Sequence, residues 1–211
     1  MKKKTTQNYQ KAFTVVELIM ATAVFSVVLL LGLTGFIQIG KMFYKGVTLS
    51  QTRDASSNVL QTVTNDIKLA SDTARPVPNM SNAICIGNHR YSYQIGRKLT
   101  ALDGGSPSQY ALKRETFNNP GECMNSSISP SSTSASTELL QNNMRLAKFS
   151  VSQIGATNLH SVNIKVIYGD DDDLTTTSDY NAAQCKASPV GTEYCAVSEL
   201  STIVYRGLGS N

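Results

Sequence analysis

The sequence predicts an α+β protein in which one long N-terminal helix packs against an antiparallel β-sheet head. No proline occurs between residues 1 and 75, and apolar residues there recur with helical spacing. After the first proline, Pro76, short runs with period two replace that pattern. All four cysteines lie in this second part, which favours a disulfide-bonded head in an oxidising compartment.

The N-terminal region combines a basic leader with a long uncharged run. Residues 1–12 hold four lysines and no acid, and the rest of the chain carries 15 basic and 15 acidic residues. Nucleic acid is therefore not a favoured partner. From Leu18 to Gly40 no residue is charged, and a helix of that length spans about 34 Å, enough to cross the hydrocarbon core of a bilayer. A secretory signal peptide has a shorter apolar region.

Glu17 lies at the edge of this run, in Phe13-Thr-Val-Val-Glu-Leu-Ile-Met20. A carboxylate in hydrocarbon costs about 2.5–3.5 kcal/mol, so it needs a partner. A simple membrane anchor has no reason to carry it, although a glutamate that reaches the membrane interface is the structural alternative.

The segment Lys11-Ala-Phe-Thr-Val-Val-Glu-Leu-Ile19 resembles the cleavage and methylation motif of type IV pilins and type II secretion pseudopilins. The resemblance implies cleavage between Ala12 and Phe13 by a prepilin peptidase, followed by N-methylation of the Phe13 amine. Glu17 then becomes the fifth residue of the mature chain, an assembly residue that recruits the next subunit by pairing with an N-terminal amine. One departure is Ala12, because the family usually has glycine before the cut.

An amphipathic run continues the predicted helix, so that a helix from Phe13 to about Ala70 would be about 87 Å long. The stretch Val59-Leu-Gln-Thr-Val-Thr-Asn-Asp-Ile-Lys-Leu-Ala70 resembles minor pilins of the W type and pseudopilins of the J type. The predicted parts are a leader at 1–12, a transmembrane or assembly half of the helix at 13–40, its amphipathic half at 41–75, and a β-rich head at 76–211.

Seven runs in the head are predicted as strands: Ala83–Ile86, Tyr91–Ile95, Lys98–Leu102, Tyr110–Thr116, Arg145–Gln153, Ser161–Tyr168 and Tyr194–Tyr205. The Arg145–Gln153 and Ser161–Tyr168 runs alternate strictly and flank a short Gly/Asn segment, so they are expected to form an antiparallel hairpin. Residues 125–137 are expected to form a polar loop.

The cysteines Cys85, Cys123, Cys185 and Cys195 are expected to form two disulfides, and their number alone leaves three pairings open. Pilins often close a C-terminal loop with a disulfide. This resemblance implies that Cys185 pairs with Cys195 and therefore Cys85 with Cys123. Zinc is not favoured, since no CxxC spacing occurs.

Two further clusters in the head have functional and structural interpretations. Asp170, Asp171, Asp172 and Asp173 offer oxygen ligands for calcium, but a solvated acidic hairpin tip is the simpler interpretation. Basic residues at 89–90 and 97–98 frame Tyr91 and Tyr93, either as a contact for DNA or as a strand edge protected by charge. No catalytic motif or cofactor fingerprint occurs, so neither an enzyme nor a cofactor is expected.

The resemblance implies a structural subunit, most simply a minor pilin, of a type IV pilus or related filament (fimbrium) that serves functions such as cell adhesion. The expected partners are other pilins, the prepilin peptidase and the inner-membrane assembly platform. The chain would first cross the inner (cytoplasmic) membrane once, with its head extracytoplasmic, and then enter a cell-surface filament. The alternatives are a type II secretion pseudopilin and, from another class, a membrane-anchored extracytoplasmic binding protein. A secreted enzyme is a remoter alternative.

Overall fold

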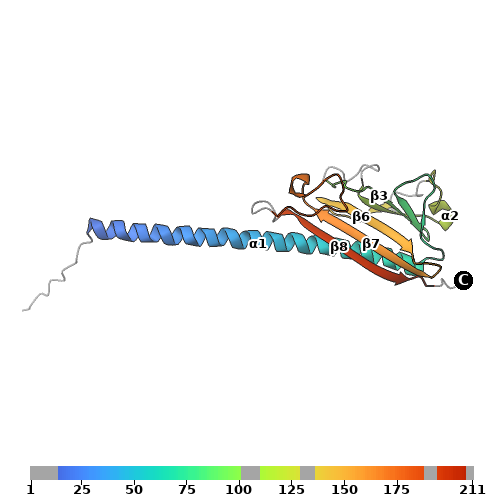
Figure 1. The fold of residues 1–211 in the computed structure, drawn as a ribbon, viewed down its shortest axis with the longest axis horizontal. Helices are drawn as coiled ribbons and strands as arrows, with labels where there is room; N and C mark the ends of the chain where they lie inside the picture. The colour runs from blue at the N-terminus through green and yellow to red at the C-terminus, as the bar shows by residue number, and fades with distance from the viewer. Residues whose placement is uncertain (1–13, 101–109, 129–135, 188–193, 208–211) are drawn as a thin grey trace, which may run out of the picture. The chain divides into compact units, whose positions relative to one another are not determined.

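A computed structural model describes residues 14–100, 110–128, 136–187 and 194–207 (Figure 1). The chain divides into two compact units, Met1–Phe43 and Tyr44–Asn211, and the second unit is called the head below. The helical elements are α1 (Val15–Leu69), α2 (Pro120–Cys123) and the 3₁₀ turn η3 (Asp171–Asp173). The strands are β1 (Arg75–Pro76), β2 (Ala83–Ile86), β3 (His89–Tyr93), β4 (Leu112–Thr116), β5 (Ser136–Glu138), β6 (Met144–Gln153), β7 (Leu159–Tyr168) and β8 (Ala196–Tyr205).

The long helix α1 has 55 residues and lies within the predicted range. Its part in the head buries one stripe of side chains at four-residue steps, namely Ala55, Val59, Val63 and Ile67. Lys68 and Ala70 mark its end, because the Lys68 carbonyl accepts a hydrogen bond from Gly207 N at 3.1 Å and Ala70 N donates back to Ile67 O at 3.3 Å.

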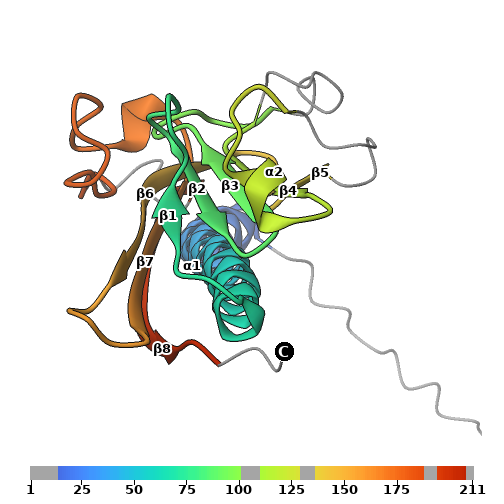
Figure 2. The ribbon, with the colours of Figure 1, turned by 90° about the vertical axis from the view of Figure 1, so that its right-hand side faces the viewer.

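The head contains two antiparallel sheets where the sequence predicted one. Sheet A has the order β1-β2-β3-β4-β5 and sheet B the order β6-β7-β8. In the end-on view of Figure 2, the helix lies between β2–β4 on one side and β6–β8 on the other. The buried stripe of α1 is therefore covered by side chains from both sheets, more than a single flat layer would cover.

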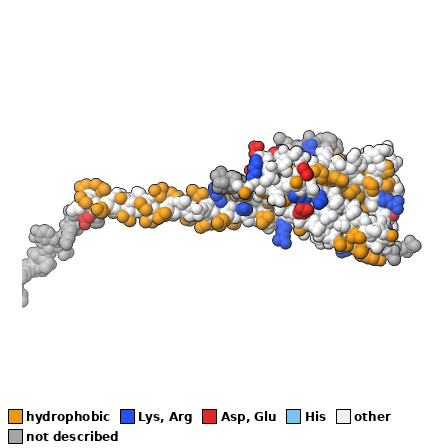
Figure 3. Space-filling view, in the orientation of Figure 1, with side chains coloured by type: hydrophobic (Ala, Val, Ile, Leu, Met, Phe, Trp, Pro, Cys, Tyr) orange, Lys and Arg blue, Asp and Glu red, His pale blue; other side chains and the backbone are white. Residues whose placement is uncertain are grey.

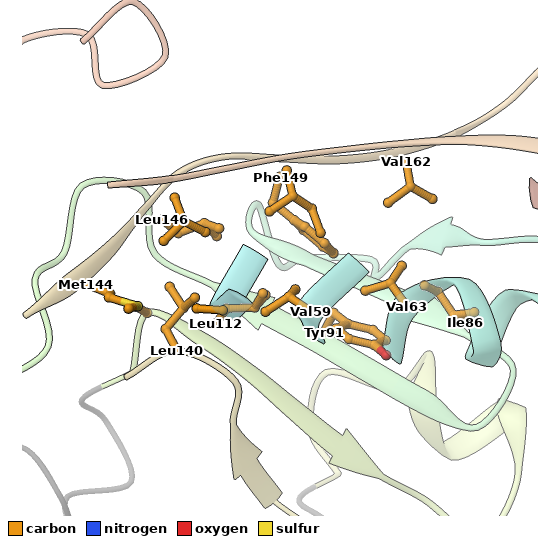
Figure 4. Packing of buried hydrophobic residues seen from close by; sticks show 14 of the residues in the cluster. Val59, Val63, Ile86, Tyr91, Leu112, Leu140, Met144, Leu146, Phe149 and Val162 are labelled. Carbon is orange, nitrogen blue, oxygen red and sulfur yellow. The ribbon is translucent and has the colours of Figure 1, made fainter. Parts of the chain in front are cut away.

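The main core lies where α1 meets these two sheets. In Figure 4, Val59 and Val63 of α1 lie among Tyr91 from β3, Phe149 from β6 and Val162 from β7. The rings of Tyr91 and Phe149 are 6.0 Å apart, so aromatic packing joins sheet A to sheet B. All five residues are buried.

Most predicted strands are confirmed, and the errors are local. The hairpin of β6 and β7 has the expected antiparallel pairing, and Gly155 in its turn has φ of +60°, which favours glycine. The expected Lys98–Leu102 strand is wrong in its described part: Lys98 makes only an isolated bridge to Arg145, and residues 101–109 lie outside the described residues. The 125–137 loop prediction is also wrong at its end, because residues 136–137 begin β5.

Candidate assembly site

The N-terminal turn of α1 holds Glu17 in a capping box. Thr14 N and Thr14 Oγ1 donate to Glu17 Oε2 at 3.0 and 2.9 Å, and Glu17 N donates to Thr14 Oγ1 at 3.3 Å. This reciprocal arrangement satisfies donors that a helix start otherwise leaves unpaired. The predicted cleavage and methylation residues, Ala12 and Phe13, lie outside the described residues.

The segment of α1 that follows Glu17 exposes large apolar side chains along its length, and Figure 3 shows them on the face in view. Phe36, for example, is 79% exposed. The hydroxyls of Thr22, Ser26 and Thr34 each donate to a backbone carbonyl three or four residues earlier, so these polar groups are satisfied within the helix. By length and composition, α1 is the one described helix that could cross a membrane.

A buried polar cluster fastens the other end of α1 to sheet A. Asp66 Oδ2 accepts hydrogen bonds from Tyr91 Oη at 2.5 Å and from Arg114 Nε at 2.7 Å, while Asp66 Oδ1 accepts from Arg114 NH2 at 2.9 Å. His89 Nε2 lies 2.9 Å from Arg114 NH2, and His89 Nδ1 lies 3.1 Å from Thr116 Oγ1. We call Asp66, Tyr91, Arg114 and His89 the helix lock.

Burial and charge set the protonation of the helix lock. Burial raises the pKa of the Tyr91 hydroxyl, and the Asp66 carboxylate raises it further, so the phenol stays neutral and donates. The hydrogen bonds that Arg114 donates to Asp66 raise the pKa of the Arg114 guanidinium. Burial lowers the pKa of His89 despite the attraction of Asp66, and Arg114 lowers it further. The helix lock therefore combines a guanidinium–carboxylate pair with a neutral phenol and a histidine that resists protonation.

The basic residues around Tyr91 are not an open surface. Arg90 is buried, donates from Nε to Glu115 Oε2 at 2.9 Å and stacks over the Phe117 ring at 4.4 Å. Its strand, β3, is an inner strand with β2 and β4 as neighbours. Both interpretations of this cluster, a DNA contact and a protected strand edge, are therefore wrong at Arg90 and Tyr91. The basic residues that frame the two tyrosines were a misleading signal, because an ion pair allows Arg90 to be buried.

The disulfides join Cys85 to Cys123 and Cys185 to Cys195, the same pairs that the resemblance implied. The first connects β2 to the short helix α2, whose start is capped by Asn119 Oδ1 at 2.9 Å from Glu122 N. The second closes the segment that precedes β8. Each bridge lies in a small cluster of buried apolar residues that is separate from the main core.

The acidic run after β7 folds into the turn η3 and does not form a hairpin tip. Lys98 Nζ pairs with Asp170, and the buried Arg145 pairs with Asp171 and donates from NH2 to Gly169 O at 2.9 Å. The hydrogen bond and charge of Lys98 lower the pKa of Asp170. Within the described residues no group of three or more potential metal ligands occurs. Two of the four carboxylates are thus engaged by cations of the protein itself.

A pocket of about 250 Å³ opens beside the helix lock, lined in part by Asp66, His89 and Asn118. The polar atoms of Asp66 and His89 are already occupied by the hydrogen bonds described above. Asp66 was not predicted as a site residue, although it lies directly before Ile67 of the buried stripe, and its partners cannot be identified from the neighbouring residues. Comparisons with models of known families, with curated proteins and with solved structures found no match.

Proposed function

We propose that this chain is a filament subunit of the type IV pilin kind, most simply a minor pilin, that assembles through α1 after its leader is removed. One observation carries the proposal: a single carboxylate, Glu17, stands in the first turn of a helix that has no other charge before Lys41. Such a group is costly in lipid and becomes favourable only beside a cation.

Assembly supplies that cation. Cleavage between Ala12 and Phe13 creates a new α-ammonium group on Phe13. Every subunit of the filament carries the same group. In the low dielectric of a helix bundle, the Glu17 carboxylate of one subunit and the ammonium of a neighbour neutralise each other. Before the Glu17 carboxylate pairs with that ammonium, it accepts two hydrogen bonds from Thr14.

The fold supports the same proposal. A long helix whose first part is apolar and exposed, and whose second part packs on antiparallel sheets, is the layout expected of a pilin-like fold. The two disulfides support an extracytoplasmic position for the head. In this proposal the first part of α1 lies in the inner membrane before assembly. A type II secretion pseudopilin would use the same chemistry.

The capping box favours a second candidate, a membrane-anchored extracytoplasmic binding protein. In that case Glu17 only starts the helix, and its charge has no partner in another chain. This candidate predicts an uncut leader and indifference to the charge of residue 17.

The substitution Glu17→Gln separates the two, because glutamine also serves at this position of a capping box but carries no charge. We expect Glu17→Gln to enter sheared filaments about tenfold less than the native chain, since it lacks the charge pair. A Thr14→Ala chain, which keeps the acid and loses the cap, is the matched control and should retain more assembly. Mass spectrometry of the native protein should find an N-methylated Phe13 start. Normal incorporation of Glu17→Gln would reject the proposal.

A further inference from the structure

Strand β8 carries the longest open edge in the described part of the head. Sheet A ends in two short strands, β1 and β5, and the outer edge of β6 is partly paired, with Gly96 N donating to Leu146 O at 2.8 Å and Leu99 N to Met144 O at 3.0 Å. β8 has ten residues and contains no lysine or proline, two residues that commonly protect an edge, and Glu199 is its one charged residue. Its edge is therefore only weakly protected.

The register shows which groups of β8 point outward. Arg206 N donates to Asn158 O at 2.8 Å, and this pair continues the register of β7 and β8. Because hydrogen-bonded pairs alternate along an antiparallel ladder, the backbone groups of the even-numbered residues of β8 bond to β7. The N–H and C=O groups of the odd-numbered residues point away from β7. No hydrogen bond of the described residues involves these groups. They belong to Val197, Glu199, Ser201, Ile203 and Tyr205.

A groove and exposed apolar side chains lie beside the outer edge of β8. A groove of about 350 Å³ is lined by Thr64 and Lys68 of α1 and by the last residues of β8. Ile203 and Tyr205 are 63% and 57% exposed. The groove is closed at one end, where Gly207 N donates to Lys68 O at 3.1 Å. An extended chain fits such a site, since it offers backbone groups at the same spacing and side chains to both faces.

We propose that the open edge of β8 binds an extended segment of a different filament subunit as an added antiparallel strand. Antiparallel pairing is the more stable arrangement for each residue. A basic side chain of that segment would face Glu199, and apolar side chains would cover Ile203 and Tyr205. The choice of a filament subunit as partner rests on the proposed function, whereas the strand-binding edge itself does not.

A second copy of this chain is not the occupant. The Tyr194 ring contacts Tyr44 at the start of the head, at 6.2 Å between centroids, and Gly207 contacts Lys68 at the end of α1. β8 thus runs in the same direction as the head part of α1. Two copies joined antiparallel along β8 would point these helix segments in opposite directions, which subunits drawn from one membrane cannot do.

The test uses the full chain in detergent and a labelled synthetic strand of about nine residues, alternating valine and threonine with one lysine opposite Glu199. A matched peptide carries N-methyl groups on the amides that would face β8. We expect the first peptide to bind and the methylated one to bind at least about tenfold more weakly, because hydrogen bonds are blocked. Equal binding of the two peptides overturns the proposal, as does a lack of binding by both.

The matched variants are Ser201→Pro and Ser201→Ala. Proline removes only an outward N–H, so the pairing with β7 survives, and alanine keeps that N–H. Ser201→Pro should lose peptide binding and filament entry, while Ser201→Ala keeps both. A homodimer of the native chain that Ser201→Pro abolishes would overturn the choice of partner. If Glu17→Gln assembles normally while the peptides still differ, the proposed function fails and the strand-binding edge stands; the opposite pattern rejects only the edge.

Discussion

Removal of the Asp66 carboxylate should destabilise the head more than any change at an exposed acid. Asp66→Ala leaves the Arg114 guanidinium and the Tyr91 hydroxyl of the helix lock without their acceptor. The Asp66 side chain is only 9% exposed, and the Arg114 side chain is 25% exposed. Water can therefore replace part of the lost interaction at Arg114, but little of it at the buried Tyr91.

The magnitude follows from these exposures. Removing one partner of a fully buried ion pair costs about 3–5 kcal/mol. Because Arg114 keeps some access to water, we expect Asp66→Ala to lower the free energy of unfolding by about 2–4 kcal/mol. Asp66→Asn keeps the shape and one acceptor oxygen, so it should cost about half as much.

The assay is urea unfolding of the oxidised full chain in detergent, followed by circular dichroism. The matched control is Asp72→Ala, because Asp72 pairs with Arg75 at 3.0 Å in the same chain but its side chain is half exposed. Such surface pairs contribute about 0–1 kcal/mol. A double-mutant cycle with Arg114→Met should give a coupling energy above about 1 kcal/mol. If Asp66→Ala costs no more than Asp72→Ala, the helix lock does not hold α1 to sheet A.

Three further predictions concern the head. Replacing both cysteines of the Cys85–Cys123 bridge by alanine should lower the free energy of unfolding by about 1.2 kcal/mol more than the same change at the Cys185–Cys195 bridge. The reason is that the first bridge closes the longer loop, with a sequence separation of 38 against 10. Equal losses of stability in urea unfolding would contradict this prediction. Burial lowers the pKa values of His89 and His160 below 6.5, so the unfolded chain binds more protons than the folded chain. The free energy of unfolding should therefore fall as the pH drops below about 6.5. An equal urea midpoint at pH values of about 7.5 and 5.5 would count against this prediction. Calcium or its chelator should leave the melting temperature unchanged, because Asp170 and Asp171 already pair with Lys98 and Arg145, and a rise with calcium would restore the metal interpretation.

The features that the sequence predicted well are those that depend on neighbouring residues. The bounds of α1 follow from the absence of proline and from the apolar spacing that ends at Ala70. The β6–β7 hairpin follows from strict alternation on both sides of Gly155. In each case one local pattern was sufficient, and the structure changed the bounds by only a few residues.

The missed features depend on contacts between distant parts of the chain. Asp66 acquires its role from Tyr91 and Arg114, which lie 25 and 48 residues later, and nothing within one helical turn of it indicates such partners. Arg90 looked exposed for the same reason, because its partner Glu115 is 25 residues away. A charged residue in a strand is read from sequence as exposed unless the partner is known, so the error has one physical cause.

The order of the strands in each sheet also depends on contacts between distant parts of the chain. Alternation identifies β8 as a strand, but its ten residues do not show whether the strand lies in the middle of a sheet or at its edge. Only the order β6-β7-β8 leaves the odd-numbered groups of β8 unpaired. A strand inside a sheet needs no protection, so the lack of lysine and proline in β8 carries meaning only once the strand order is known. The apolar exposure of Ile203 and Tyr205 then becomes the signature of a surface that another strand covers.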